Sequence, residues 1–468
     1  MALAACGSSS AGSSTASDPT IDALSYFPPT SPFVMTVATA PQDAAVKRAQ
    51  ALEQRNPQYQ LAMTALLARL GEMGINYDQD IRPLLGNPIA LGAEGVRPSA
   101  FLATWVTRSA AAATRLVKKI GLAAAGSHDG AALYAGRGLA IGLDGPVVII
   151  SQSTQLVDDA LDRHAAHQGF DRASYTRATA GVTQGGVIEM FGDLTGVLAQ
   201  PSAAKARQVP WVDAITGYAA SVSASSTGVA VSFHVSTTGR QLSASQLPIA
   251  SGAAPPDTAG DLPIQMAIRD PAQIIDFARA AAQATDPAGY AAFVRRQAAI
   301  RRRSGFDLNA LVGMLTGDLT IESDTHSTLA RAQVSNPAAV TRMLSRMAST
   351  GGTGVLRKGT KLAPLGGGLY AIISRHSVIE VGVIGDELAV GRSTPAQLRA
   401  YATAPAAAAA AGTGSVAFRI ALAEVVRLGM HRQPSALEQE LLDRLGDIVG
   451  SAGATTSGLN GTAHIALR

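Results

Sequence analysis

Apolar and polar residues alternate along several segments with the period of two that is typical of β-strands. In the clearest segment, apolar residues at odd positions alternate with small or polar ones: Val229, Val231, Phe233 and Val235 against Ala230, Ser232, His234 and Ser236. Similar runs predict strands at 33–39, 89–93, 101–107, 131–135, 147–151, 187–191 and 218–237. Alternation of this kind predicts strands with one face buried.

Other segments carry apolar residues three and four positions apart, which is the spacing of the buried side of a helix. The two clearest sets are Met63, Leu66, Leu67 and Leu70, and then Val340, Met343, Leu344 and Met347. Helix starts are indicated by capping residues directly before a proline, at Asn56, Asp270, Asp286, Asn336 and Thr394. Strands separated by helices, with neighbouring strand pairs, predict an α+β fold with an antiparallel sheet component.

The pattern occurs twice. Segment 32–37 recurs at 263–268 and segment 74–87 recurs at 305–318, both at an offset of 231 residues. Further matches follow in the same order at offsets between 227 and 240: 113–116 with 340–343, 130–135 with 366–371, 153–154 with 393–394, Gly228 with Gly458, and His234 with His464. We therefore expect an internal duplication.

The duplication predicts two tandem mixed α/β domains, at 22–240 and 261–468, after an N-terminal segment at 1–21. The stretch 241–260 between them is rich in Pro, Gly and Ala, as a linker is. Such copies could pack as a pseudo-symmetric pair. The Ala-rich stretch 404–414 within the second copy is expected to be a surface loop or a helix extension.

Composition supports a folded, multidomain protein. The chain has 468 residues, of which 47% are hydrophobic and 15% charged. Its 38 basic and 34 acidic residues leave a net charge of only +4, which does not indicate a nucleic-acid partner. A single cysteine excludes an internal disulfide and a thiolate zinc cluster, and no run of apolar residues is long enough to predict a membrane-spanning helix.

That single cysteine, Cys6, follows Leu3-Ala4-Ala5, the pattern of a bacterial lipobox, and precedes a Gly, Ser, Ala and Thr tether at 7–17. We expect a diacylglyceryl group on Cys6 and a lipid-anchored protein on the extracytoplasmic face of the cell membrane. The pattern departs from a complete signal peptide, because only five residues precede Cys6. A chance cysteine in an Ala-rich segment is the alternative interpretation.

The strand-like opening ALSYFPPTSPFVMTVAT and the long α+β body with its Leu-Tyr-containing strands resemble the bacterial "domain of unknown function 3352" family. The resemblance extends from about Ala23 onwards and is carried by hydrophobic and turn-like motifs. It implies an exported bacterial protein of high-GC type, and it implies no catalytic residues.

Catalytic and metal-binding patterns are weak. Ser202 and Lys205 match Ser-x-x-Lys without the companion motifs of penicillin-binding enzymes. His164 and His167 follow three aspartates on a predicted helix and could hold a metal, but a solvated helix explains the same residues (Asp158, Asp159 and Asp162). Glycines at 136–138 and 351–354 are interpreted as turns. We therefore assign no catalytic residue, metal ligand or cofactor.

Two further features attract attention. His234 and His464 fall at corresponding positions of the two copies, which favours a structural role in a shared environment. A cluster of arginines could bind anionic lipid headgroups or wall polymers, or could simply be a solvated helix face: Arg295, Arg296, Arg301, Arg302 and Arg303.

The sequence favours a non-enzymatic envelope protein that binds or scaffolds, with a lipid, another apolar ligand or an envelope protein as its partner and with the groove between the copies as the place for a ligand. The alternatives are an exported hydrolase whose site is built from distant residues, and a purely structural partner. A hydrolase should show a deep polar cleft, a lipid binder an apolar cavity, and a structural partner a broad exposed apolar patch.

Overall fold

The computed structural model describes residues 18–40, 43–54, 57–72, 74–95, 101–238, 242–252, 254–349, 360–407, 413–430 and 432–467. Helices and antiparallel strands confirm the predicted α+β class. Cys6 with its tether, the cap residue Asn56 and the glycines at 351–354 lie outside the described residues.

The first half begins with α1 (Pro19–Leu24), β1 (Phe33–Val37) and the helix pair α2 (Ala44–Gln54) and α3 (Pro57–Glu72). After the short helical turns η1 (Tyr77–Ile81) and η2 (Arg82–Leu84) come β2 (Ile89–Ala93), β3 (Phe101–Val106), α4 (Ala110–Lys119), β4 (Ala123–His128), β5 (Ala131–Gly136), β6 (Leu139–Asp144) and β7 (Val147–Ser151). The half ends with α5 (Thr154–Ala165), α6 (Arg172–Ala178), β8 (Ile188–Asp193), α7 (Thr195–Leu198), η3 (Pro201–Ala203), η4 (Ala206–Gln208), α8 (Pro210–Asp213), β9 (Ile215–Ser225) and β10 (Gly228–Thr237).

The second half follows η5 (Ala244–Gln246) and β11 (Thr258–Ala259). It contains β12 (Ile264–Arg269), α9 (Pro271–Thr285), α10 (Pro287–Ser304), α11 (Leu308–Met314), β13 (Leu315–Ser323), β14 (Thr328–Val334), α12 (Pro337–Ser349), β15 (Lys361–Gly366), β16 (Leu369–Ile373), β17 (Val378–Ile384) and β18 (Glu387–Arg392). Its last elements are α13 (Pro395–Ala402), β19 (Ala406–Ala407), β20 (Val416–Ala421), α14 (Leu422–Gly429), α15 (Ala436–Arg444), β21 (Leu445–Thr455) and β22 (Gly458–Leu467).

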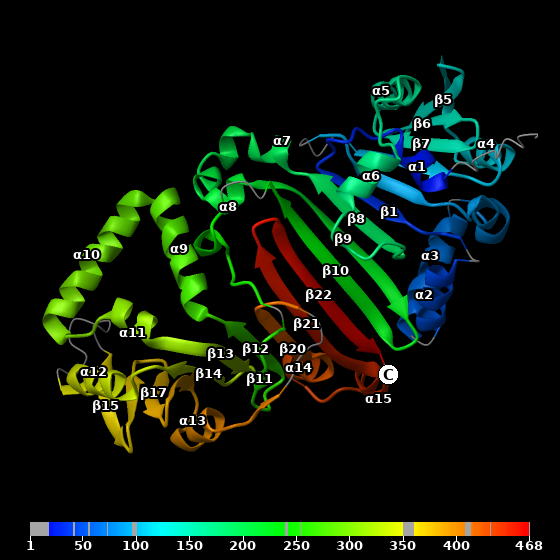
Figure 1. The fold of residues 1–468 in the computed structure, drawn as a ribbon. Helices are drawn as coiled ribbons and strands as arrows, with labels where there is room; N and C mark the ends of the chain where they lie inside the picture. Colours follow the sequence, from blue (N-terminus) through cyan, green and yellow to red (C-terminus); the bar gives the residue numbers. More distant parts are fainter. Residues whose placement is uncertain are drawn as a thin grey trace, which may run out of the picture.

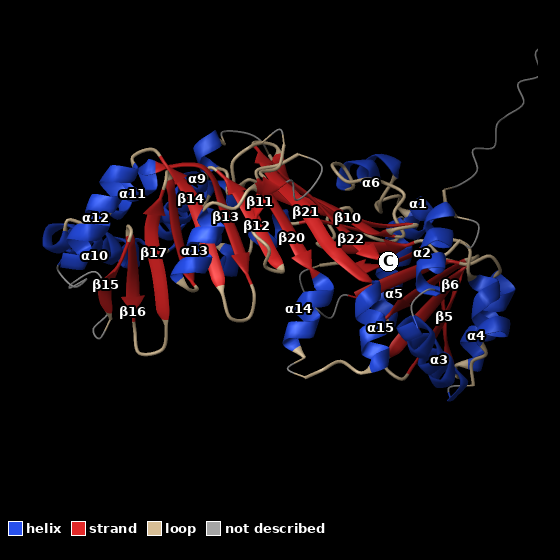
Figure 2. Ribbon diagram, turned by 90° about the horizontal axis from the view of Figure 1, so that it is seen from below, coloured by secondary structure: helices blue, strands red, loops and turns tan. Residues whose placement is uncertain are grey.

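One 20-stranded antiparallel sheet runs through both halves (Figures 1 and 2). The strand pairings give the spatial order β4-β5-β6-β7-β3-β2-β1-β8-β9-β10 for the first half and β22-β21-β20-β12-β13-β14-β18-β17-β16-β15 for the second. Counted inward from each end of the sheet, strands at the same position are corresponding elements of the two halves, from β4 and β15 to β10 and β22. The order is therefore pseudo-symmetric about the middle of the sheet.

The two halves join where β10 pairs with β22, and we call these paired residues, 228–236 and 458–466, the seam. Gly228 lies opposite Ala466 and Ser236 lies opposite Gly458, so that Ser232 and Thr462 face each other at its centre. In Figure 1 the green β10 and the red β22 run side by side through the middle of the molecule. Main-chain hydrogen bonds thus join the halves directly, in addition to the chain that connects them.

Each half has its own hydrophobic cores. In the first half Tyr26, Phe27, Leu102, Ile149 and Phe191 are at most 1% exposed and belong to one cluster. In the second half one cluster contains Leu329, Leu369 and Leu398, and another joins α12 to β15, β16 and β17. The first-half cluster extends to Val34 on β1 and Phe191 on β8, and no cluster of described residues contains members of both halves, so burial stabilises each half separately.

Each of the seven predicted segments contains strand residues, and 89–93 and 147–151 match at both ends. Segment 218–237 is two strands, β9 and β10, joined as a hairpin through Ser226 and Thr227. The linker 241–260 is not entirely irregular, because β11 within it pairs with β19. Residues 406–407 of the Ala-rich stretch form that partner strand, so this part of it is neither loop nor helix.

Helix predictions need two corrections. Leu67 is 41% exposed, because the α3 side that carries it is not covered, whereas Val340, Leu344 and Met347 of α12 are buried as expected. Asp270 has φ +49 and makes no capping bond, because its left-handed backbone turns the side chain away from the first helical turn. Caps form at the other described positions, Asp286, Asn336 and Thr394.

Candidate functional site

The middle of the sheet has two unlike faces. Eight strands form it, in the order β1, β8, β9, β10, β22, β21, β20 and β12. In β1 the buried residues are Val34 and Thr36, while the larger Phe33, Met35 and Val37 are only half-buried. The strand thus buries the face that bears a polar residue and leaves the wholly apolar face more open.

The polar face is defined by a row of residues paired from strand to strand: Thr36, Glu189, Ser221, Ser232, Thr462, Ser451, Ala417 and Ala267. Several of its polar members are at most 6% exposed, and Glu189 and Ser451 among them are hydrogen-bonded. Glu189 accepts from the hydroxyl of Tyr175 on α6 and from the amide of Gly185, at 2.8 Å. Helix α6 and the residues after it therefore cover this face in the first half.

The apolar face is defined by the next row, which again has one residue on each strand: Val37, Ile188, Val222, Val231, Ala463, Gly450, Phe418 and Met266. No member carries a polar side chain. Parallel rows add Met35, Met190, Phe233, Val416 and Ile268. At about 4.8 Å between strands, eight strands give an apolar surface about 34 Å across.

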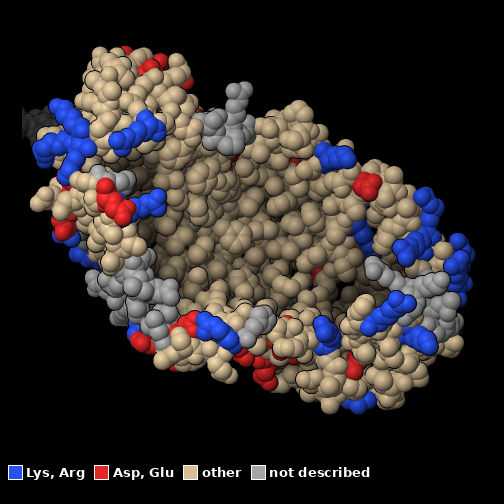
Figure 3. Space-filling model, turned by 180° about the vertical axis from the view of Figure 1, so that it is seen from behind, with Lys and Arg blue, Asp and Glu red and all other residues tan. Residues whose placement is uncertain are grey.

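The apolar face is hollowed and open. Helix α6 lies in front of the sheet in Figure 1, so Figure 3, seen from behind, shows the opposite face. Figure 3 shows a broad concavity whose floor is formed by uncharged residues, with Lys, Arg, Asp and Glu gathered mainly around its rim. At the margins Phe101 and Ile264 are 37% and 38% exposed. A contiguous open apolar surface of this kind marks an interaction site.

Helices at the ends of the strands frame the eight-stranded region. α2 packs on β9, and α14 and α15 pack on β21. α9 lies against β13 and against the turns η4 and η5. The side view in Figure 2 shows α3, α14 and α15 projecting from the same side of the sheet.

Two glycines keep the floor of the apolar face flat. A Cβ at Gly461 would come within 2.2 Å of the Phe233 ring, and one at Gly450 within 2.3 Å of the Phe418 ring. Each ring therefore lies over the backbone of the neighbouring strand. Only glycine permits this approach, which lays the aromatic surface along the sheet.

A smaller pocket of about 360 Å³ lies on the polar face at the seam. Its walls include Thr183, Ser232, Val449, Thr462 and His464. The amide of Thr183 donates to Ser232 Oγ at 3.3 Å, so the segment after α6 forms one side of the pocket.

The two predicted histidines lie on this polar face, on either side of the seam centre. His464 lines the pocket, and His234 Nδ1 is 2.5 Å from Asn460 Oδ1 across the seam. A hydrogen bond between the halves gives His234 a structural partner.

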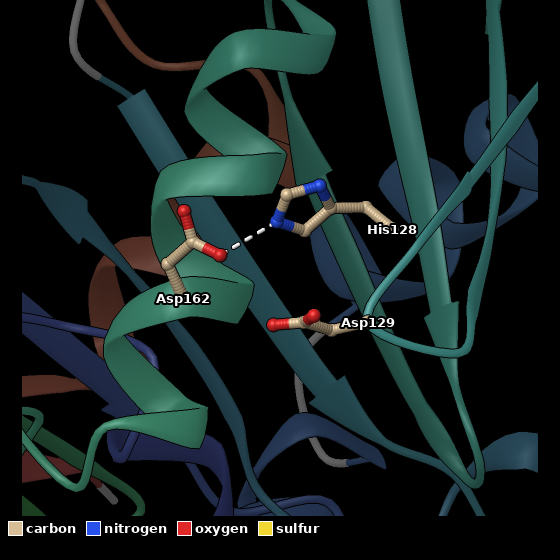
Figure 4. Close-up of side chains that lie close together, drawn as sticks. All are labelled: His128, Asp129 and Asp162. Atoms are coloured by element: carbon tan, nitrogen blue, oxygen red, sulfur yellow. Dashed lines mark hydrogen bonds and ion pairs between the residues drawn. The ribbon is translucent and has the colours of Figure 1, made fainter.

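A histidine and three aspartates meet away from the sheet centre. His128 at the end of β4 lies with its Nε2 2.6 Å from Asp162 Oδ1 on α5, and with its Nδ1 3.9 Å from Asp158 Oδ1. Figure 4 shows Asp162 facing the imidazole and Asp129 beside it on the turn after β4. One donor atom each from His128, Asp129 and Asp162 lie within 4.8 Å of one another, a spacing a metal ion could use.

An ion pair explains the same cluster without a metal. The hydrogen bond to Asp162, with the nearby carboxylates, raises the pKa of His128 above its usual value. A protonated His128 ties the β4–β5 hairpin to α5.

The histidines suggested by the sequence as metal ligands point elsewhere. His164 Nδ1 is 2.8 Å from Ser25 Oγ, and its ring stacks on Tyr26 at 4.4 Å. His167 is exposed at the end of α5. Of the aspartates noted on α5, Asp162 and Asp158 lie near His128, which reaches α5 only through the folding of the β4–β5 hairpin.

The structure offers little to a hydrolase within the residues it describes. Ser202 and Lys205 are both exposed near η3, with no hydrogen bond recorded between them. Ser25 Oγ lies 2.8 Å from His164 Nδ1 and also 2.7 Å from the carbonyl of Asp22, where it caps the end of α1. Burial raises the pKa of Glu94 in the first half and of Glu322, Glu380 and Glu387 in the second half.

All five arginines of the predicted cluster lie on α10 and are exposed. Arg301 Nη1 is 3.3 Å from Asp307. Within the described part of the chain, no ion pair is recorded for the other four.

Among the described residues, no helix combines the length and apolar character needed to cross a bilayer.

Comparisons with known proteins leave the family open. No family model matches the chain, and no curated protein does. Three solved structures, titled as crystal forms IV, III and I of TP0453, match 46–49% of this chain and 81–82% of theirs, at 8–9% identity and TM-scores of 0.28 to 0.29. At that level of similarity they carry no argument about fold or function, and the resemblance to the domain of unknown function 3352 stays a prediction.

Proposed function

We propose that this is a lipid-anchored protein of the bacterial cell envelope that binds an apolar ligand, a lipid or lipid-like molecule, on the apolar face of its central sheet. The observation that supports it is the open apolar face of that sheet. The covered face buries Val34 and Phe191 together with small and polar residues such as Thr36 and Ser451, whereas large apolar residues of the other face, such as Met35, Val231 and Phe233, stay half-open. Folding alone would favour covering both sets of apolar residues.

The face is a broad open patch, which the sequence analysis expected of a structural partner, but the distribution of its charges favours a lipid. Its width of about 34 Å is about twice the span of one lipid's acyl chains, which cover half of the roughly 30 Å hydrocarbon core of a bilayer. Its floor is uncharged and concave, and basic residues gather at the end of the rim where α10 lies (Figures 1 and 3). An amphiphile with an anionic headgroup matches both features, with acyl chains on the floor and the headgroup at the rim.

The pseudo-symmetric strand order supports a duplicated origin for the two halves. If the halves are copies, the seam is the contact that turns two partial faces into one surface. The ligand would then lie across both copies, which is the groove that the sequence analysis anticipated. A diacylglyceryl group on Cys6 would hold this surface near the membrane through the tether.

Native mass spectrometry with lipid extraction, on protein produced in its own bacterial host, tests both parts of the proposal. We expect a retained lipid and an acylated Cys6. A fluorescent fatty acid should also bind the purified protein and be displaced by the extracted lipid. Protein that carries no lipid and fails to bind the fluorescent fatty acid would refute the apolar ligand.

Two variants locate the ligand. Phe233→Glu places a charge on the apolar face, and we expect it to weaken fatty-acid binding at least tenfold, since a carboxylate next to an acyl chain costs more than about 1.4 kcal/mol. Thr462→Glu, on the neighbouring strand, places the same charge on the polar face and into the small pocket. Equal loss in both variants, or loss only in Thr462→Glu, would assign the ligand to the pocket. Circular dichroism should show both variants folded.

A further inference from the structure

The helix pair α9–α10 is the most exposed arm of the molecule. α10 packs chiefly on α9, and α9 lies against β13 and on the turns η4 and η5. Figure 1 shows the pair extending from the body at the left of the view, with α10 on the outer side. With 18 residues, α10 presents a surface about 27 Å long.

Charge on α10 is of one sign only. Its sequence PAGYAAFVRRQAAIRRRS contains five arginines and no acidic residue. Arg295 lies seven positions before Arg302, and Arg296 seven before Arg303, so these four form two adjacent rows along one side of the helix. Repulsion among such close cations is unfavourable in the isolated protein, and an anionic surface would relieve it.

Apolar side chains accompany the charges. Phe293 and Val294, one turn of helix or less before the arginine rows, are 43% and 44% exposed. Tyr290 lies near Phe293, with ring centroids 6.2 Å apart. At about 100° per residue, Phe293 and Val294 lie on the side of the helix opposite the four arginines, and an apolar side opposed to an arginine-rich side is the arrangement of a helix that lies in a bilayer interface.

The corresponding helix of the first half lacks the charge, although its Leu67 is 41% exposed. α3, PQYQLAMTALLARLGE, has one arginine and one glutamate, and so no net charge. A solvated helix in this place therefore does not require an arginine cluster, and the cluster on α10 calls for a partner of its own.

We propose that α10 docks on an anionic phospholipid bilayer, with Arg295, Arg296, Arg302 and Arg303 at the phosphates and with Phe293 and Val294 at the boundary of the acyl chains. This contact is separate from the anchor at Cys6, but it uses arginines at the same end of the rim that the proposed function assigns to the headgroup of the ligand. A soluble anionic polymer would meet the same charges but would leave Phe293 in water.

Vesicle flotation tests the proposal on the full chain with Cys6→Ser, which removes any acyl anchor. We expect binding to vesicles of equal parts phosphatidylglycerol and phosphatidylcholine, little binding to phosphatidylcholine alone, and a steep loss of binding as salt is raised. The quadruple variant Arg295→Gln, Arg296→Gln, Arg302→Gln and Arg303→Gln should lower the partition coefficient on the order of 100-fold.

A matched control removes four exposed basic residues from the first half: Arg115→Gln, Lys118→Gln, Arg177→Gln and Arg207→Gln. It should change binding far less, and an equal loss in control and test would show that net charge alone acts and overturn the proposal. Absence of binding to the anionic vesicles would overturn it as well.

Insertion of Phe293 into the bilayer can be measured separately. The variant Phe293→Trp adds an indole whose emission should shift to the blue with anionic vesicles and remain unchanged with a soluble anionic polymer. No shift with vesicles would contradict the placement of Phe293. Phe233→Glu should still bind vesicles, so that failure of the ligand proposal and failure of this one can be told apart.

Discussion

The helix pairs α2–α3 and α9–α10 occupy corresponding places, after β1 and after β12, but they are used differently. α2 packs on β9 of its own half and buries Ala45 and Val46 to 7% exposure. In α9 only the first residue, Pro271, is buried, and α10 leaves its arginines in solvent. The same topology thus provides a wall of the sheet in one half and a free arm in the other.

A second difference lies within the halves, at the corresponding strands β3 and β14. Thr104 donates to the carbonyl of Ala23 at the end of α1, at 2.6 Å. Its counterpart Arg331 donates to the carbonyls of Tyr401 and Ala402 at the end of α13, at 2.7 and 3.0 Å, and lies over the Tyr401 ring. Both satisfy the C-terminal carbonyls of a helix, one with a hydroxyl and one with a buried cation.

Replacing Thr104 and Arg331 should give the largest difference in the free energy of unfolding between a variant of the first half and one of the second. We expect Arg331→Met to lower the free energy of unfolding by about 2–4 kcal/mol, because two buried carbonyls lose their donor and nearby Glu387 loses a compensating charge. Thr104→Val, which breaks one neutral bond, should cost about 1–2 kcal/mol. Urea denaturation measures both, and a larger loss for Thr104→Val would contradict this account.

The seam offers a test of the packing between halves. Gly461 corresponds to Val231 and Phe233 to Ala463, so the two sides of the seam differ at these positions. Gly461→Val should destabilise by about 1–3 kcal/mol, because its side chain would meet the Phe233 ring. In combination with Phe233→Ala, which removes the ring, this loss should be largely recovered. Additive effects in the double-mutant cycle would show that the ring and the glycine are independent.

An aspartate side chain caps the start of α10, whereas the start of α9 has no capping bond. Asp286→Ala removes the bond from the amide of Gly289 to Asp286 Oδ1, and should cost about 1 kcal/mol of local stability at the start of α10. Hydrogen exchange of the first α10 amides reports it. Asp270→Gly is the control, because Asp270 makes no capping bond and its φ of +49 suits glycine. Exchange in α10 should be unaffected by that change.

The smallest expected effect is on the pH dependence of stability. The pKa of His128 is raised in the folded protein, mainly by its hydrogen bond to Asp162, so its contribution is present below the unfolded value of 6.5 and is lost as pH rises through the folded pKa. The melting temperature should therefore fall slightly more between pH 6 and pH 8 than it does in His128→Gln. Identical pH profiles would show that the ion pair adds nothing measurable.

Much of the fold could be predicted from periodicity, because alternation such as Val229 to Ser236 states which residues share a face. It does not state which face is covered. That depends on where α6 and the helices after β9 and β21 come to lie, and here the apolar side of the central strands is the open one. Strand β4 was missed because its residues, AAAGSH, show no apolar alternation and pair through the backbone alone.

The candidate site could be anticipated only as a groove between copies. Pairing of β10 with β22 joins edges about 230 residues apart, and no local signal selects one edge over another. The arginines of α10, by contrast, were visible directly, since a run of like charges on a helix is a local property of the sequence.

Pairing of the seam also has a consequence for synthesis. When the first half leaves the ribosome, β10 is an open edge strand of ten residues with alternating valines, and its proper partner is made some 220 residues later. At roughly 5–20 residues per second, that interval is on the order of ten to forty seconds. Because β10 pairs in an antiparallel register centred on Ser232, a second nascent chain could occupy its edge in the same way. A nascent first half therefore needs either rapid completion or a chaperone that keeps this edge from pairing with its own kind.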